Sequence, residues 1–238
     1  MDAINTQMYS NSGLDIETIT PDELVGSLND IEKKFAPKLL YLSGDKSLMK
    51  YPRVSIIGTR NPSEKGKEYT HLITNFLVMN KVVIVSGLAA GIDTVAHKTA
   101  IAKRGRTVAV LGTPLNKYYP QENQVLQDEI IKNHLVVSQF PDGSPIQRKN
   151  FPMRNRTMAL LSHASIIVEA REGSGTLHQG WEALRLGRPL YIIQETIKDE
   201  WASKLVEYGA EILPISKIKV IMESLPATVP TVTKGAPF

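Results

Sequence analysis

The sequence predicts an α/β protein with a doubly wound, mostly parallel Rossmann-like sheet and helices on both faces. Six short apolar runs rich in β-branched residues recur along residues 53–193, and amphipathic segments of helical period separate most of them. The runs are continuously apolar and do not alternate with polar residues, which is typical of parallel strands covered on both sides. Strands and helices that alternate in this way indicate a doubly wound sheet.

The expected elements follow in chain order. The six strands are expected at residues 53–58, 82–86, 107–111, 135–138, 165–169 and 189–193. The helices between them are expected at residues 64–79, 93–103, 121–133, 156–162 and 176–186. Ahead of them, Thr20, Pro21 and Glu23 fit the N-cap, first position and capping-box partner of a short helix. Residues 38–50 predict a strand, a Gly-Asp turn and a brief helix.

The domain organisation expected from this pattern has three parts. Residues 1–50 form an N-terminal extension whose first twenty residues are polar and expected to be loosely ordered. Residues 51–225 form the Rossmann-like domain, which closes with a helix ended by Gly209, a strand and a last helix. Residues 226–238, with three prolines, are expected to form a flexible tail.

Composition excludes several classes of protein. The 238 residues are 42% hydrophobic and 22% charged, as in ordinary globular proteins, and the net charge of +4 favours a polyanionic partner without identifying it. The absence of cysteine excludes disulfides and cysteine zinc sites, and the five histidines lack metal spacing, so we expect neither metal nor cofactor. Without a signal peptide or a membrane-length apolar run, a cytoplasmic location is expected.

A glycine-bearing turn follows the first strand of the expected sheet. Open parallel sheets bind ligands outside the carboxyl ends of their strands. Gly58 lets the backbone approach a ligand closely, Thr59 offers a hydroxyl and Arg60 offers a forked cation suited to phosphate. The alternative is that Arg60 is a solvated loop residue.

A second turn, residues 86–93, follows the second strand and opens a helix. The turn begins at Ser86, its two glycines, Gly87 and Gly91, give the backbone conformational freedom, and the exposed amides at a helix start form an anion site. The glycines lack the GxGxxG spacing of the dinucleotide fingerprint, which disfavours NAD binding. Asp93 either contacts a ribose or nucleobase or serves as the N-cap of the helix.

Residues 147–156 combine four cations, no acid and one aromatic ring. A site that grips a nucleic-acid backbone needs cations for phosphates and an aromatic face for a base. The candidate residues in this segment are Arg148, Lys149, Phe151, Arg154, Asn155 and Arg156. In the alternative interpretation Phe151 fills the core and the arginines form a solvated helix start, although cations there oppose the helix dipole.

A further turn joins the fifth strand to the next helix. Ser174, Gly175 and Thr176 supply hydroxyls and amides that can form a nest for an anion. Because the carboxyl ends of parallel strands meet at one sheet edge, this turn, the two earlier turns and the basic segment are expected to converge there.

Several segments, in this order, resemble the DprA/Smf family of bacterial DNA-processing proteins. They are RVSIIGTR (53–60), VSGLAAGIDTVAH (85–97), AVLGTPL (109–115) with YPQEN (119–123), SQFP (138–141), NFPMRNR (150–156) and SGTL (174–177). The resemblance implies a non-enzymatic protein that binds single-stranded DNA, protects it and loads the RecA recombinase during natural transformation and recombination, usually as a homodimer.

The resemblance also implies roles for the candidate residues. Arg60 and the 86–93 turn would lie in the DNA pocket, and the 174–176 turn would close its opposite wall. Phosphate clamps and a stacking ring would come from Arg148 or Lys149, Phe151, Arg154 and Arg156.

The sequence departs from the family pattern in two ways. We expect a short form without the winged-helix module that many members carry. The turn after the fifth strand places Glu172 and Gly173 before Ser174, where the family pairs an arginine with serine and glycine.

Two other functions are compatible with such a sheet. One is a nucleotide phosphoribohydrolase-like enzyme, but the catalytic glutamate expected soon after the glycine-threonine turn is absent, and the next acid is Glu182. The other is a sensor domain that binds a small nucleotide signal. A sensor would use the same phosphate turns with less need for the basic segment.

Overall fold

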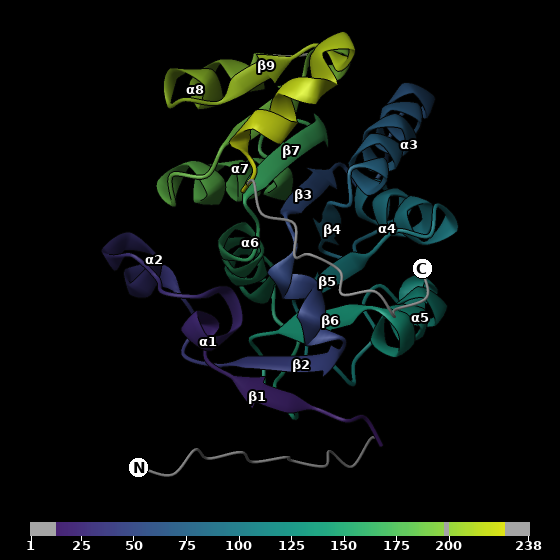
Figure 1. The fold of residues 1–238 in the computed structure, drawn as a ribbon, viewed down its shortest axis with the longest axis vertical. Coiled ribbons are helices and arrows are strands. Elements are labelled where there is room, and N and C mark those ends of the chain that lie inside the picture. Colours follow the sequence, from purple (N-terminus) through teal and green to yellow (C-terminus); the bar gives the residue numbers. More distant parts are fainter. Residues whose placement is uncertain (1–12, 198–199, 227–238) are drawn as a thin grey trace, which may run out of the picture.

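A mixed sheet with helices on both faces forms the body of the protein (Figure 1). The computed structural model describes residues 13–197 and 200–226, and within them the sheet has nine strands in the order β1-β2-β6-β5-β4-β3-β7-β8-β9. From β6 to β9 every neighbouring pair is parallel, whereas β1 and β2 are antiparallel to their neighbours. The predicted fold class is confirmed.

The six expected strands lie within one residue of their predicted bounds. They are β3 (Arg53–Gly58), β4 (Val83–Ser86), β5 (Thr107–Leu111), β6 (Leu135–Ser138), β7 (Ala164–Glu169) and β8 (Leu190–Ile193). The sheet is completed by β1 (Glu17–Ile19), β2 (Leu40–Gly44) and β9 (Glu211–Leu213). Thus β2 from the expected N-terminal extension pairs with β6 of the Rossmann-like body, and β1 extends the sheet by pairing with β2.

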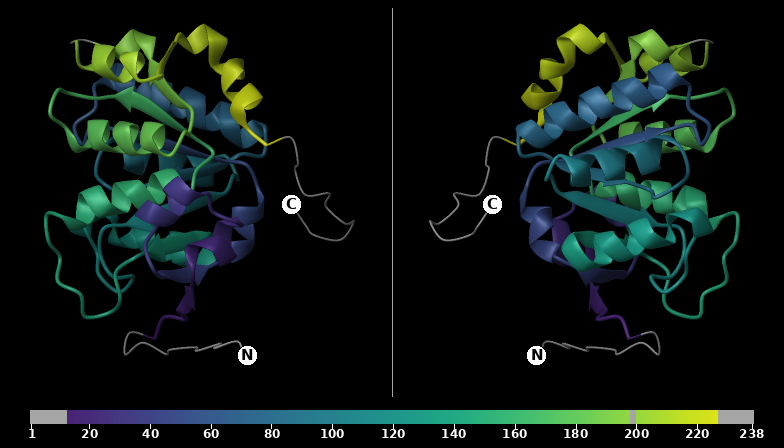
Figure 2. Two further views of the ribbon diagram at one scale, coloured as in Figure 1. Left: turned by 90° about the vertical axis from the view of Figure 1, so that its left-hand side faces the viewer. Right: turned by 90° about the vertical axis from the view of Figure 1, so that its right-hand side faces the viewer.

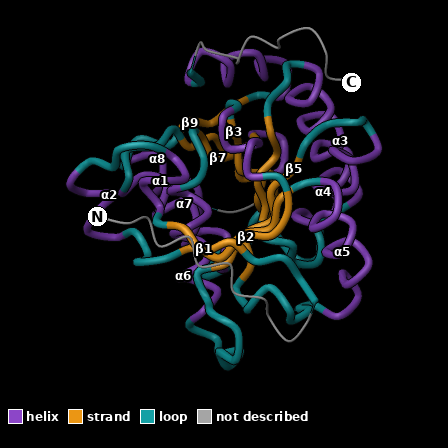
Figure 3. Tube along the Cα trace, turned by 60° about the horizontal axis from the view of Figure 1, so that its bottom comes forward, coloured by secondary structure: helices purple, strands orange, loops and turns teal. Residues whose placement is uncertain are grey.

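Helices cover both faces of the sheet. The α-helices are α1 (Pro21–Val25), α2 (Asp30–Phe35), α3 (Glu64–Met79), α4 (Ile92–Ala102), α5 (Gln124–Asn133), α6 (Asn150–Leu160), α7 (Gly175–Arg185) and α8 (Trp201–Glu207). The 3-10 segments are η1 (Lys46–Lys50), η2 (Gln121–Asn123), η3 (Gln194–Thr196) and η4 (Ile215–Ser224). Figure 3 shows α3, α4 and α5 on one face, with α1, α2, α6, α7 and α8 on the other. Within the described ranges no helix has the length and apolarity of a membrane span.

The strand sequences are continuously apolar because successive side chains enter two different cores. In β4, Val83 and Val85 belong to one buried cluster, whereas Ile84 between them belongs to the cluster on the other face. All three side chains are fully buried, and each such side chain stabilises the fold by about 1.5–3 kcal/mol relative to an exposed one. The central sheet is therefore rigid enough to hold loop residues in fixed positions at its edges.

Helix α6 begins six residues before its predicted start, at Asn150 instead of 156. Pro152 lies in its first turn, where the backbone amides have no partner within the helix, so proline removes no helical hydrogen bond. As a result Phe151 and Arg154 are held on the first turns of a helix, whereas the sequence placed them in a loop leading to one.

The order in which the strands are added to the sheet reverses between β3 and β7. From β3 the chain proceeds outward through β4, β5 and β6, and it then returns to place β7 on the other side of β3. Loops from the carboxyl ends of β3 and β7 therefore diverge to opposite faces and leave a crevice between them. The loops that follow β6 and β7 project from the same side of the molecule (Figure 2, left panel).

A buried histidine should make the stability of this fold depend on pH. His97 of α4 is fully buried, with Nδ1 2.6 Å from Thr107 Oγ1, and burial lowers its pKa to about 3. A histidine that is neutral when folded and protonated when unfolded stabilises the fold above pH 6.5, and this contribution is lost as the pH falls toward 3. Between these values we expect the free energy of unfolding to fall by about 1.4 kcal/mol per pH unit on account of His97.

The measurement is urea unfolding of wild type and His97→Gln between about pH 7.5 and pH 4.5, a range that spans the titration of an ordinary histidine. The variant should show a flatter pH profile, whereas His178→Gln, at an exposed position, should retain the wild-type profile. An unchanged slope in His97→Gln would show that His97 does not titrate as its burial requires. His163, whose pKa is lowered to about 4 by burial and by Arg53, contributes in the same direction and leaves a residual slope.

Candidate nucleic-acid interface

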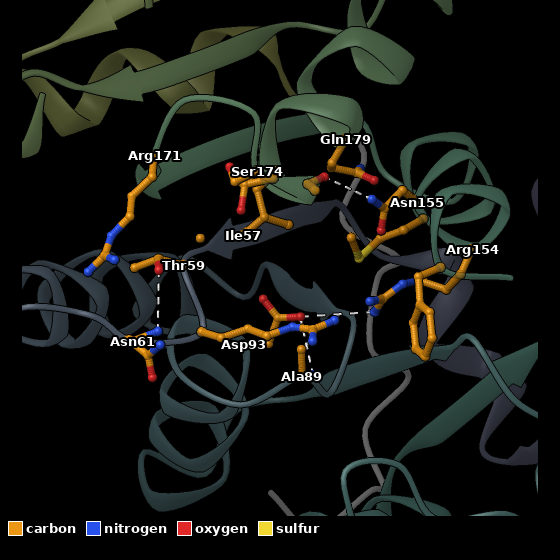
Figure 4. A pocket seen from close by; sticks show the side chains of 16 residues that line it. Ile57, Thr59, Asn61, Ala89, Asp93, Arg154, Asn155, Arg171, Ser174 and Gln179 are labelled. Carbon is orange, nitrogen blue, oxygen red and sulfur yellow. Dashed lines mark hydrogen bonds and ion pairs between the residues drawn. The ribbon is translucent and has the colours of Figure 1, made fainter. Parts of the chain in front are cut away.

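A pocket of about 340 Å³ lies at the point where the strand order reverses (Figure 4). Its walls are the turns after β3 and β7, the loop that leads into α4, and the first turns of α6. This is the crevice expected between diverging loops of a doubly wound sheet. All four predicted segments therefore contribute to one pocket, as expected of loops that follow strands ending at the same sheet edge.

A buried ion pair forms the floor of the pocket. Arg154, which is only 6% exposed, places Nη1 4.0 Å from Asp93 Oδ2 and donates a hydrogen bond to the carbonyl oxygen of Val110 at 3.1 Å. Burial lowers the pKa of Arg154 and raises the pKa of Asp93, and each charge opposes the effect of burial on the other. Each charge of the pair thus offsets part of the cost of burying the other.

Asp93 is not the N-cap of α4, since Gly91 occupies that position. The Asp93 carboxylate instead accepts hydrogen bonds from the backbone amides of Gly87 and Ala89, at 3.1 and 3.3 Å. It therefore closes the loop between β4 and α4, and the amides that would have formed an anion site there already have a partner.

Three other residues of this loop, Ser86, Gly87 and Gly91, hold its backbone against the strands and the turn beside the ion pair. The Ser86 hydroxyl is buried and donates to the Ile56 carbonyl oxygen at 2.7 Å. A Cβ atom on Gly87 would lie 1.3 Å from Nη1 of Arg154, so only glycine permits the buried guanidinium. Gly91 has a positive φ of 81° and packs against Thr59, whose carbonyl oxygen accepts from the Ile92 amide at 3.2 Å.

A cation and two aromatic rings form one rim of the pocket. The guanidinium of Arg60 lies 5.9 Å from the centroid of the Phe151 ring, and the rings of Phe151 and Tyr119 are 5.1 Å apart and tilted by 42°. Arg60 is exposed, Phe151 is half-buried and Tyr119 is 44% exposed. Aromatic rings beside a cation are the combination that binds a base and its phosphate.

The turn after β7 forms the opposite wall. Ser174, Gly175 and Thr176 all line the pocket, and the Gly175 carbonyl oxygen accepts from Asn155 Nδ2 at 3.1 Å. Within the described residues, Ser174 Oγ is buried without a hydrogen-bond partner. This wall therefore has an unsatisfied hydroxyl just beneath its surface.

Arg171 is a pocket residue that was not predicted from the sequence. It is exposed, and Figure 4 shows it across the pocket from Arg154, with Asp93 between them. Glu172, which appeared to place an acid beside the anion site, is exposed and does not line the pocket. The signal that could have found Arg171 is its position as the first charged residue beyond the carboxyl end of β7.

Three of the predicted cations do not line this pocket. Arg148 and Lys149 are exposed ahead of α6. Arg156 turns away from the pocket and pairs with Glu182 at 3.1 and 3.2 Å, with its guanidinium 5.2 Å from the centroid of the Phe35 ring. The carboxylate of Glu182 is held by Arg156 and Arg185 and does not line the pocket.

The charge of the pocket suits phosphate. Among its lining residues there are three arginines, Arg60, Arg154 and Arg171, and one acid, Asp93. Because Asp93 is paired with Arg154, two exposed guanidiniums remain, and guanidiniums match the geometry of phosphate oxygens. No group of three or more metal-ligating side chains occurs in the part of the chain that the structure describes.

Comparisons with known proteins show the family to which the chain belongs. The family model of DNA recombination-mediator protein A matches residues 17–226. DNA processing protein DprA of Bacillus subtilis is 37% identical over 194 residues, which cover 80% of this chain and 65% of that protein. DprA of Streptococcus pneumoniae is 39% identical over 181 residues, which cover 75% of this chain and 64% of that protein. The chain thus spans slightly less than two thirds of these relatives.

A solved structure has the same fold over most of the chain. DNA processing protein A from Helicobacter pylori, in a study of its single-stranded DNA binding mode, superposes with a TM-score of 0.75 at 30% identity. The match covers 89% of this chain and 98% of that one. The resemblance seen in the sequence is confirmed, and the chain belongs to the DNA recombination-mediator protein A family, the DprA/Smf family of DNA-processing proteins.

Proposed function

We propose that this protein binds single-stranded DNA by its backbone, protects it and assists the loading of RecA in DNA uptake and recombination. The observation that carries the proposal is the pair of exposed guanidiniums, Arg60 and Arg171, on two sides of a pocket whose rim is the Phe151 ring. The related protein from Helicobacter pylori has a single-stranded DNA binding mode, which supports the same ligand for this chain.

The aromatic rim favours a single strand over a duplex. A base can stack on Phe151 or Tyr119 only when its face is not covered by a neighbouring base pair. Stacking of this kind contributes about 1–3 kcal/mol per base and depends little on sequence. The two guanidiniums would then neutralise the phosphates on either side of the stacked nucleotide.

Of the predicted site residues, we assign direct contact with DNA to Thr59, Arg60, Phe151, Ser174, Gly175 and Thr176, with Arg171 added. We assign a positioning role to six residues: Ser86, Gly87, Gly91, Asp93, Arg154 and Asn155. The polar side chains among them already have hydrogen-bond or ion-pair partners within the protein, and the two glycines allow the loop to pack closely against its neighbours. Gly58 permits the turn that carries Arg60. Arg148 and Lys149 would contact a strand that extends beyond the pocket.

Fluorescence anisotropy with labelled oligo-dT over a series of salt concentrations tests this proposal. We expect saturable binding that weakens as salt rises, with a slope of log affinity against log salt of about −0.7 for each phosphate neutralised. A duplex of the same length should bind more weakly. A parallel thermal-shift series with nucleoside monophosphates tests the sensor function, since a specific ligand raises the melting temperature of its protein. Stabilisation by a mononucleotide without oligonucleotide binding would contradict the proposal.

The protein partners are also part of the proposal. We expect a homodimer by analytical ultracentrifugation and retention of RecA on the immobilised protein. A monomer at all concentrations tested, or no retention of RecA, would remove the corresponding part while leaving DNA binding intact. A cytoplasmic location is consistent with both partners.

A further inference from the structure

A second, smaller pocket adjoins the first behind the Phe151 ring. Its volume is about 180 Å³, and it shares Arg60, Ala89, Phe151 and Arg154 with the larger pocket. Backbone forms part of its wall, because a Cβ atom on Gly112 would lie 2.8 Å from the Phe151 ring. The space is suited to one planar base, while the phosphates remain beside the arginines of the larger pocket.

The smaller pocket contains an acid that phosphate binding does not explain. Glu122 is the one acidic residue among those that line it. Glu122 is exposed, and within the described residues no hydrogen bond or salt bridge engages its carboxylate. A carboxylate repels phosphate, so its presence beside a backbone-binding site weakens binding unless it meets N–H donors on the ligand.

The segment that carries Glu122 is fixed to the protein. Glu122 lies in η2, directly before Asn123, and Asn123 Nδ2 donates to the Leu88 carbonyl oxygen at 2.9 Å and to Thr94 Oγ1 at 2.8 Å. Tyr119 comes from the same short segment and contacts Phe151. One short, anchored segment therefore contributes both an aromatic residue and an acidic residue to the lining of the same small pocket, and Glu122 also borders a neighbouring pocket beside α4 and α5.

The donors that a nucleobase offers decide which base such a site prefers. Guanine presents N1–H and N2–H side by side and can give two parallel hydrogen bonds to one carboxylate. Cytosine and adenine offer one amine beside a ring-nitrogen acceptor, and the N3–H of thymine lies between two carbonyl oxygens that repel a carboxylate. Carboxylate side chains read bases through such amines.

We infer that the smaller pocket is a base subsite in which Glu122 selects guanine within a single strand. This inference rests on the proposed function, since it requires that the strand binds beside Arg60 and Phe151. It adds a sequence preference to a mode of binding whose phosphate and stacking contacts are indifferent to sequence.

The experiment compares oligo-dT with the same oligonucleotide carrying one central guanine, by anisotropy with the full chain. Wild type should bind the guanine-containing strand about 10-fold more tightly, because a bidentate contact discriminates between bases. Inosine at the same position, which lacks the N2 amine, should lose most of the preference, whereas 7-deazaguanine, which keeps N1–H and N2–H, should retain it. Glu122→Gln should bind both strands equally and should bind oligo-dT at least as tightly as wild type.

Glu129→Gln is the matched control, because it removes the same charge from the neighbouring helix α5 at a residue that does not line the subsite. It should keep the guanine preference. Equal binding of both strands by wild type, or a preference that persists in Glu122→Gln, would overturn the inference and leave backbone binding standing. Failure to bind any of these strands would instead overturn the proposed function together with the inference.

Discussion

Replacing Arg154 by methionine is expected to lower the free energy of unfolding by about 3 kcal/mol at neutral pH, since removal of one partner from a buried ion pair costs about 3–5 kcal/mol. The cost arises because the other charge remains buried without compensation. The low end applies here, since the Asp93 carboxylate keeps its hydrogen bonds from the amides of Gly87 and Ala89. Methionine fills the volume along the side chain, so the loss reports on the charge more than on a cavity.

The deficit should grow as the pH rises. Without Arg154 nothing opposes the effect of burial, and the pKa of Asp93 in the folded protein rises further above its value in the unfolded chain. The folded state then holds a proton that the unfolded state releases, and stability falls as the pH rises through the raised pKa. Urea unfolding of the variant should therefore show a smaller deficit near about pH 5 than near about pH 8.

A double-variant cycle separates the ion pair from other effects of the substitution. Asp93→Asn in the Arg154→Met background should recover part of the lost stability, because no buried charge remains. Arg148→Met, the same change at an exposed position, should leave stability at the wild-type level. If Arg154→Met were as stable as wild type at every pH, the ion pair would not support the floor of the pocket.

Removing both exposed guanidiniums, in Arg60→Ala/Arg171→Ala, is expected to weaken oligo-dT binding by about 100-fold, because a hydrogen bond to a charged group contributes about 1.5–3 kcal/mol. Because both arginines are exposed, we expect each to contribute near the lower end of this free-energy range. The salt slope should also become shallower by about 0.7 for each phosphate that is no longer neutralised. Anisotropy titrations at several salt concentrations measure both quantities.

The control for this variant is Arg104→Ala. Arg104 is an exposed arginine in the turn between α4 and β5, so it lies at the sheet edge opposite the pocket. This substitution removes the same kind of charge and should leave both affinity and salt slope close to wild type. A weakening of similar size in Arg104→Ala would show that net charge, and not the pocket, determines binding. The melting temperature of the double variant should stay near that of wild type, since neither guanidinium is buried.

The fold was predictable from sequence because both signals that define it are local. Apolar runs and helical periodicity located β3 to β8 and fixed α3 at its observed bounds. β1 was not predictable in this way, since its three residues are half-buried and depend on pairing with β2 for their conformation. The start of α6 was placed six residues too late, at 156 instead of Asn150; Pro152 lies in the observed first turn, a position that proline fits.

The candidate site was predictable in position but only partly in composition. Strand ends located the turns that carry Arg60 and Ser174, because parallel strands deliver their loops to one edge. Local sequence could not show that Arg154 pairs with Asp93 or that Arg156 pairs with Glu182, since each pair joins segments that only the folded chain brings together. Two neighbouring arginines of one basic segment therefore have different surroundings, one beneath the pocket and one behind it.

Photocrosslinking tests the central claim most directly, because it maps where a strand lies on the protein. Oligo-dT that carries 5-iodouracil at single positions is bound, irradiated and digested, and the crosslinked peptides are identified by mass spectrometry. Binding in the pocket predicts crosslinks at Phe151 or Tyr119, the aromatic residues of its rim, and their disappearance in Arg60→Ala/Arg171→Ala. Crosslinks confined to residues outside the pocket, such as the exposed Tyr208, would contradict binding of the strand at this site.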